Sequence, residues 1–140
     1  MSLETSRKIL KVSGILSILF GIIGFVMGIL VFATGGMVAA KLDMNVEDNA
    51  LVAGISLVGG IMAVVSGIIA IIEGICSLRG AKDSTKIMPA WVFAIIGLVF
   101  GAIHLVGSFG NGAGNIAGSV ISLLISALIF VAANTIKKSR

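Results

Sequence analysis

The chain has 140 residues, of which 58% are hydrophobic and 11% charged, and its mean hydropathy is +1.20. Soluble domains carry about 25% charged residues, so this composition excludes a soluble globular protein and indicates an integral membrane protein. The net charge of +4 comes mainly from basic residues at the ends of apolar stretches, which favours lipid headgroups as partners and not nucleic acid.

Four apolar stretches approach the roughly 20 residues that cross a bilayer core. They are residues 9–33, 51–72, 90–109 and 116–136. Because a spanning segment must satisfy its own backbone hydrogen bonds, each is expected to be a helix. The first stretch is long enough to span and no clear cleavage pattern follows a short apolar core, so we expect it to be retained. The predicted fold is an all-α membrane protein, a four-transmembrane-helix bundle forming one domain over residues 1–140.

Small residues recur at alternating spacings of three and four along the first stretch, at Gly14, Ser17, Gly21, Gly24 and Gly28. Residues at this spacing share one helix face. Small residues on such a face let two helices approach closely in lipid. The second stretch continues the same spacing through Gly60, Ala63, Gly67, Ala70 and Gly74. Both faces are predicted to be helix-packing seams.

Residues 34–49 are predicted to form an external loop, which holds Asp43, Glu47 and Asp48. Asp43, Asn45 and Glu47 lie at alternate positions as in a calcium loop, but the glycine and the glutamate that such a loop needs at its sixth and twelfth positions are missing. Asn45 followed by Asp48 instead resembles a helix capping box. The cap interpretation is therefore favoured over a cation site.

Glu73 follows the apolar run of the second stretch, and two interpretations are open. At the membrane interface it would pair with Lys11, Lys137 or Lys138, which its position favours. Deeper in the bilayer it would be an ion-coupling carboxylate, because intramembrane acids are costly and mark ion pathways. The depth of the residue decides between them.

The loop predicted at residues 79–88 has Gly80 where a helix would stop and Pro89 where the next would start. Trp91 follows as an expected interfacial anchor. A shift of 80 residues places the small residues of the first stretch against the third stretch, including Gly97 and Gly101. This similarity predicts two repeated helical hairpins.

His104 interrupts that seam, and the fourth stretch carries polar residues at Ser119, Ser122, Ser126 and Asn134. At 1.5 Å per residue, His104, Ser119 and Ser122 lie at similar depths and can meet. A hydrogen-bonded cluster there, which Ser56 could join, would be a structural latch between helices, and this interpretation is favoured. The alternative is a protonatable relay or cation ligand on a pathway.

The basic residues predict the orientation of the chain in the membrane. Three lie before or at the start of the first stretch, three lie between the second and third, three follow the fourth, and only Lys41 lies on the other side. Positive charge near span ends is held in the cytoplasm, so both termini are expected there. The basic cytoplasmic face is expected to contact anionic lipids. The expected location is the cell membrane, as a multi-pass protein of a bacterial inner membrane.

The chain has one histidine and one cysteine, Cys76. These cannot supply a metal site or a nucleophile with its base and orienting group. We therefore expect no enzymatic activity, no cofactor and no metal site, and we expect Cys76 to be a packing residue.

Two family resemblances rest on residues 10–28, on Gly59-Gly60-Ile61-Met62 with Ser66-Gly67, and on residues 82–89. Across most of its length the chain resembles small Gly-rich four-pass bacterial membrane proteins of unknown function. Its second stretch is also similar to the CD20-like membrane-spanning four-domain family. That resemblance implies four helices with both ends inside and homo-oligomers, without a common activity.

Two functions follow from these patterns. Seams on nearly every helix favour a structural or accessory protein that forms homo-oligomers or docks on a larger membrane complex. The alternative is a small oligomeric channel or transporter for ions or small solutes. Its path would be lined by His104, Ser119, Ser122, Ser126 and Asn134.

Overall fold

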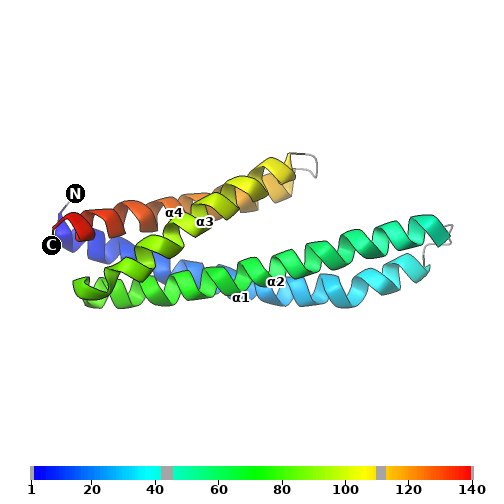
Figure 1. Cartoon of the computed structure of the whole chain (residues 1–140), viewed down its shortest axis with the longest axis horizontal. Helices are drawn as coiled ribbons and strands as arrows, with labels where there is room; N and C mark the ends of the chain where they lie inside the picture. The colour runs from blue at the N-terminus through cyan, green and yellow to red at the C-terminus, as the bar shows by residue number, and fades with distance from the viewer. Residues whose placement is uncertain (1, 42–45, 110–112, 140) are drawn as a thin grey trace. The chain divides into compact units, whose positions relative to one another are not determined.

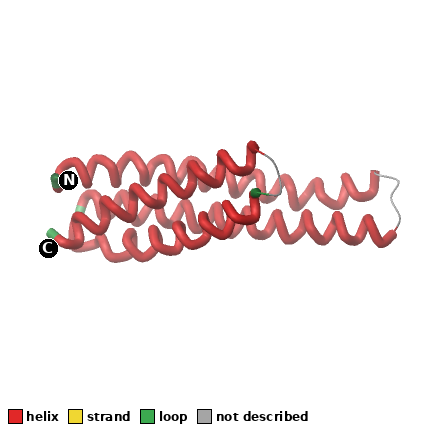
Figure 2. Tube along the Cα trace, turned by 90° about the horizontal axis from the view of Figure 1, so that it is seen from above, coloured by secondary structure: helices red, strands yellow, loops and turns green. Residues whose placement is uncertain are grey.

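The computed structural model describes residues 2–41, 46–109 and 113–139. These residues form four α-helices and one short 3₁₀-helix: α1 (Leu3–Lys41), α2 (Val46–Lys82), η1 (Ser84–Lys86), α3 (Ile87–Ser108) and α4 (Ala113–Lys138) (Figure 1). Figure 2 shows no strand among the described residues. All four α-helices are long and apolar enough to cross a membrane. The predicted all-α fold with four membrane helices is confirmed.

The chain packs as two compact units. Unit 1 consists of Met1–Leu19 and Ile69–Arg140, which include the start of α1, the end of α2, and all of η1, α3 and α4. Unit 2 is Phe20–Ile68, the remainder of α1 and α2. In unit 1 the start of α1 and the end of α4 lie at the same end, as an even number of spans requires (Figures 1 and 2).

The first two helices are longer than expected. Helix α1 continues to Lys41 and α2 begins at Val46, so the predicted loop over residues 34–49 is wrong. Residues 37–41 read Met-Val-Ala-Ala-Lys, and their helix propensity carries the helix beyond the apolar stretch. Asn45 of the proposed cap and Asp43 of the calcium-loop pattern lie outside the described residues. Because α1 and α2 have 39 and 37 residues against 22 and 26 in α3 and α4, the two hairpins differ in length.

Helix α2 also continues through Gly80, which was predicted to end it. A Cβ added at Gly80 would lie 2.7 Å from Cδ1 of Ile87, so this glycine allows α3 to start close to α2. Asp83 then caps η1 by accepting hydrogen bonds from the backbone N–H (3.0 Å) and hydroxyl (2.7 Å) of Thr85. Pro89 lies in the first turn of α3, where its missing N–H costs no helix bond.

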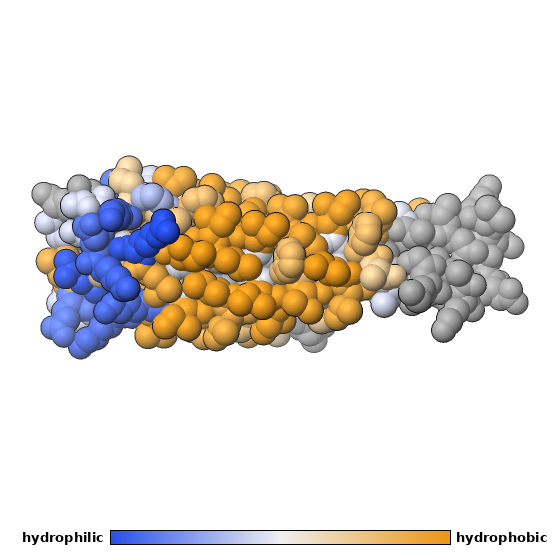
Figure 3. Space-filling view, turned by 90° about the horizontal axis from the view of Figure 1, so that it is seen from below, coloured by the Kyte–Doolittle hydropathy of each residue, from blue (hydrophilic) through white to orange (hydrophobic). Residues whose placement is uncertain are grey.

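The apolar core of unit 1 is built from α1, α2, α3 and α4 and is rich in alanine and isoleucine. Its buried members are Leu10, Ala81, Ile87, Ala90, Ala94, Ile125, Ile129, Ala132, Ala133 and Ile136. Many larger apolar side chains instead face outward, as expected for helices that contact lipid. Figure 3 shows this hydrophobic surface and the hydrophilic residues gathered at one end of unit 1.

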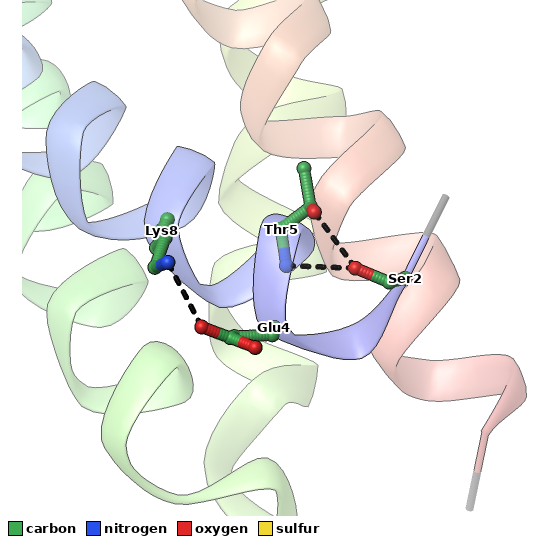
Figure 4. A network of polar contacts seen from close by, with 4 residues as sticks. All are labelled: Ser2, Glu4, Thr5 and Lys8. Atoms are coloured by element: carbon green, nitrogen blue, oxygen red, sulfur yellow. Dashed lines mark hydrogen bonds and ion pairs between the residues drawn. The ribbon is translucent and has the colours of Figure 1, made fainter.

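The first turns of α1 hold an exposed polar network (Figure 4). The Ser2 hydroxyl accepts a hydrogen bond from the backbone N–H of Thr5 at 3.2 Å, and Lys8 pairs with Glu4 at 2.8 Å. These contacts cap the helix and suit a solvent-facing end.

Candidate functional site

In unit 1 the predicted seams of α1 and α2 pack against each other. A Cβ added at Gly14 would lie 3.0 Å from the carbonyl oxygen of Gly74, and one added at Gly74 would lie 2.5 Å from the carbonyl oxygen of Gly14. The hydroxyl of Ser17 donates a hydrogen bond to the carbonyl of Ala70 at 2.9 Å. The two backbones are therefore in close contact, and the absence of side chains at both glycines makes this possible.

The seams meet in the same way in unit 2. A Cβ at Gly67 would lie 2.8 Å from the carbonyl oxygen of Gly21, and one at Gly60 would lie 3.1 Å from the carbonyl oxygen of Gly28. A Cβ at Gly28 would lie 3.1 Å from Cβ of Ala63. Gly24 is looser, since its added Cβ would lie 3.8 Å from Cα of Gly67. Small residues assigned to the seams of α1 and α2 are thus used within the chain.

The two seam glycines of α3 have different surroundings. A Cβ at Gly101 would make ordinary contact with Leu123 of α4, at 3.6 Å. A Cβ at Gly97 would lie 2.7 Å from Oγ of Ser126 and 3.0 Å from Oε2 of Glu73. Gly97 therefore leaves room for two polar side chains where Gly101 meets an apolar one.

Glu73 is the buried acid at this point of unit 1. Glu73 is 3% exposed and Ser126 is 4% exposed. The Ser126 hydroxyl donates a hydrogen bond to Oε2 of Glu73 at 3.4 Å, whereas Oε1 is shielded and has no hydrogen-bond partner among the described residues. A shielded carboxyl oxygen without a partner is costly in an apolar interior, because transfer from water is not compensated by a hydrogen bond.

The position of this carboxyl follows from the helices around it. Gly97 is the eleventh residue of the 22-residue α3, and Ser126 is the fourteenth of the 26-residue α4. At 1.5 Å per residue Gly97 lies about 15 Å along α3, near half the thickness of a bilayer core. Glu73 of α2 therefore lies opposite the middle of α3 and the middle of α4.

The basic partners expected for an interfacial Glu73 are engaged elsewhere or exposed. Lys11 and Lys138 are exposed, and the ammonium of Lys137 lies 3.8 Å from the ring centroid of Trp91. Among the described residues no ion pair involves Glu73. The ion pair favoured by the sequence is therefore not observed, and the alternative of a deep carboxylate fits the register.

His104 and Ser119 form a second polar pair between α3 and α4. Nδ1 of His104 lies 2.7 Å from Oγ of Ser119, as their matching depths predicted. His104 is seven residues, about two helical turns, from Gly97 on α3, and Ser119 is the same distance from Ser126 on α4. The His104–Ser119 pair therefore lies along the α3–α4 contact, about two turns from the Glu73–Ser126 pair, which joins α2 and α4.

The remaining polar residues of the predicted pathway lie elsewhere. Ser122 is exposed, Asn134 is half-buried two turns beyond Ser126, and the side chain of Ser56 is outside the described part of the chain. Near the start of α3, the rings of Trp91 and Phe130 stack with centroids 6.1 Å apart, and Nε1 of Trp91 is shielded with no hydrogen-bond partner among the described residues, so the interfacial anchor stays a prediction.

The grouping of Glu73, Gly97 and Ser126 was missed from the sequence, where Gly97 was assigned to a seam, Ser126 to a pathway and Glu73 to an interfacial ion pair. The register could have revealed it, because antiparallel pairing of His104 with Ser119 also pairs Gly97 with Ser126. Within the residues that the structure describes, no group of three or more His, Cys, Asp or Glu side chains could hold a metal ion.

Comparisons with known protein families, curated proteins and solved structures find no match for this chain.

Proposed function

We propose that this multi-pass membrane protein is a small channel or transporter for cations, with Glu73 as its ion-binding carboxyl. The observation that supports this function is the burial of Glu73 opposite the centres of α3 and α4 with one oxygen unpartnered. Ionisable residues at such depth cost several kcal/mol, on the order of 3 by insertion scales, and are kept where they act on ions or protons.

The packing of the seams supports this choice over a purely structural role. The sequence argument for an accessory protein depended on more seams than one chain could use. In the structure Gly14 packs with Gly74 and Gly21 with Gly67, so the chain uses these seams itself. A packing role also gives no reason for a carboxyl at this position, where an apolar side chain would be less costly.

The test is cation flux through the purified protein in lipid vesicles, measured with entrapped pH- and Na⁺-sensitive dyes. We expect the wild type to conduct and Glu73→Gln to lose at least about tenfold in rate, because the amide keeps the shape but cannot carry the charge. Glu4→Gln is the matched control, since Glu4 is exposed at the start of α1. Absence of flux in the wild type, or equal flux in Glu73→Gln, would overturn the proposal.

A second candidate is self-association or docking on a larger membrane complex, and a specific surface in unit 2 favours it. A shallow, wide-open apolar groove of about 540 Å³ lies on α2; its lining residues are Leu51, Gly54, Ile55, Val58 and Gly59. Side chains added at Gly54 or Gly59 would meet nothing within 4 Å, so a helix of a second copy could approach this face closely. This candidate is compatible with transport, because small channels are commonly symmetric oligomers.

We further propose that the basic end of unit 1 contacts anionic lipids at the cytoplasmic face of the cell membrane, as expected for a bacterial inner-membrane protein. Its exposed basic residues come from α1, α2, η1 and α4. They are Arg7, Lys8, Lys11, Arg79, Lys82, Lys86 and Lys138. Each basic residue near an anionic surface adds about 1 kcal/mol of attraction.

A further inference from the structure

We infer that the ligand of the Glu73 site is a proton, held on Oε1 of Glu73, and that Gly97 is the residue that shapes the site. This inference rests on the proposed function and names the ion that the carboxyl handles. The carboxyl, the Ser126 hydroxyl and the open position at Gly97 carry it together.

The number of oxygen ligands at this site fits a proton better than Ca²⁺ or Mg²⁺. Hard cations such as Ca²⁺ and Mg²⁺ take six or more oxygens. The described side chains bring three oxygens together here, two from Glu73 and one from Ser126. The backbone carbonyl of Glu73 already accepts a hydrogen bond from Ser77 at 2.7 Å. A proton, in contrast, needs one oxygen lone pair.

The two oxygens of Glu73 differ in a way that suits proton binding. Oε2 accepts the hydrogen bond from Ser126, whereas Oε1 accepts none from the described residues. On proton uptake an O–H bond forms between a lone pair of Oε1 and a proton delivered by water. On release the same bond breaks, its electron pair stays on the carboxylate and the proton passes back to water, so the step balances with water alone.

Gly97 shapes the site because a side chain there would occupy the space of the polar groups. Its added Cβ would lie 2.7 Å from Oγ of Ser126, closer than real Cβ atoms approach a neighbour, and 3.2 Å from Oε1 of Glu73. An alanine must therefore displace the hydroxyl or the carboxyl. Gly101, one turn along the same helix, offers a matched control because its added Cβ would make ordinary contact at 3.6 Å.

Other titratable and charged groups on the packed helices also affect a proton site. Along α1 the nearest such residue is Lys11. On α2 Cys76 and Arg79 follow Glu73 by one and two turns. Helix α3 contributes His104, about two turns from Gly97, and α4 contributes Lys137, about three turns from Ser126. His104 and its partner Ser119 lie along the α3–α4 contact, about two turns from Gly97 and Ser126.

The test uses N,N′-dicyclohexylcarbodiimide, which adds to protonated carboxyls in apolar surroundings, on the full-length protein in phosphatidylcholine vesicles. Mass spectrometry measures the labelled fraction of Glu73 as the pH is raised from about 5 to about 9. We expect labelling to fall with rising pH and to be unchanged when Na⁺ or K⁺ replaces choline at constant ionic strength. Protection by Na⁺ or K⁺, labelling that is independent of pH, or no labelling would overturn the inference.

Variants test the geometry of the site. We expect Ser126→Ala to change the pH dependence of labelling, because the hydroxyl that donates a hydrogen bond to Oε2 of Glu73 is gone. Gly97→Ala should change the pH profile by about one unit or more, and Gly101→Ala should keep the wild-type profile. Wild-type profiles in both Ser126→Ala and Gly97→Ala would contradict the assignment, and Ser126→Ala provides this test even if Gly97→Ala does not fold.

The labelling experiment tests the proton site and the flux experiment tests the transport function, so either proposal can be overturned without the other. Proton-dependent labelling without any cation flux would support the proton site and overturn the proposed transport function. Flux that depends on Glu73 together with protection by Na⁺ would support transport and overturn the proton as ligand.

Discussion

Asp83 is the residue whose hydrogen bonds fix the connection between α2 and α3. The hydroxyl and the backbone N–H of Thr85 both donate to its carboxylate, and these bonds hold the pKa of Asp83 below its usual range. The ammonium nitrogen of Lys86 lies 3.7 Å from Oδ2 of Asp83 and adds a smaller attraction. Because the bonds favour the charged form, the cap stabilises the fold only while Asp83 is ionised.

The sign of the pH effect follows from the lowered pKa. The stabilisation is fully present above the pKa of an unfolded aspartate, about 3.9, and is lost as the pH falls through the lower folded pKa. We expect the melting temperature of the wild type to exceed that of Asp83→Asn at about pH 6, and the difference to shrink toward pH 2. Thermal unfolding in detergent measures it. Thr85→Val should reduce the pH dependence, and an unchanged profile in that variant would contradict the cap.

At the same scale, Glu73 shows what a sequence could and could not predict. The sequence identified the residue and both of its possible roles, but its depth depended on which side chains of α3 and α4 stand opposite it. That register follows from tertiary packing, in which Gly97 admits the Ser126 hydroxyl beside the carboxyl. His104 with Ser119 was predictable because equal distances from a shared helix connection bring two residues together.

At the scale of elements, the seams of α1 and α2 make those two helices a tightly packed pair in each unit. In unit 2 a Cβ at Gly67 would lie 2.7 Å from the backbone nitrogen of Phe25, and backbone cannot move away as a side chain can. Dispersion between such closely packed backbones is a main source of helix association in lipid.

We therefore expect Gly67→Ala to destabilise the protein by about 1–3 kcal/mol through overpacking. Gly118→Ala in α4 meets open space and should be neutral or stabilising by up to about 1 kcal/mol, because alanine is the better helix former. Unfolding in a denaturing detergent measures both. Equal stability of Gly67→Ala and Gly118→Ala would show that α1 and α2 do not pack through this seam.

The helices themselves were more predictable than their ends. Apolar stretches of about 20 residues predicted the number and order of the helices, because lipid leaves a spanning backbone no other structure. Gly80 and residues 34–41 were predicted to end or interrupt helices and did not. A glycine ends a helix only where the chain must turn, and at Gly80 it instead accommodates Ile87.

At the scale of the whole molecule, the groove bordered by Gly54 and Gly59 is the surface of α2 that suits contact with a second copy. Lipid chains can cover any apolar surface, so exposure of Leu51, Ile55 and Val58 does not by itself require a partner. A glycine that meets open space on a membrane helix is different, because it lets another helix backbone approach closely.

We expect the wild type to be a homo-oligomer by native mass spectrometry in mild detergent, and Gly59→Leu to be largely monomeric because leucine fills the groove. Gly118→Leu is the control, since Gly118 of α4 also meets nothing within 4 Å but lies outside the groove. It adds the same side chain to an exposed helix and should leave the oligomer intact. A monomeric wild type, or an oligomeric Gly59→Leu, would exclude self-association through this face. If Gly59→Leu abolishes both the oligomer and cation flux while Glu73 is still labelled, the proton site is formed within one chain and conduction requires its neighbours.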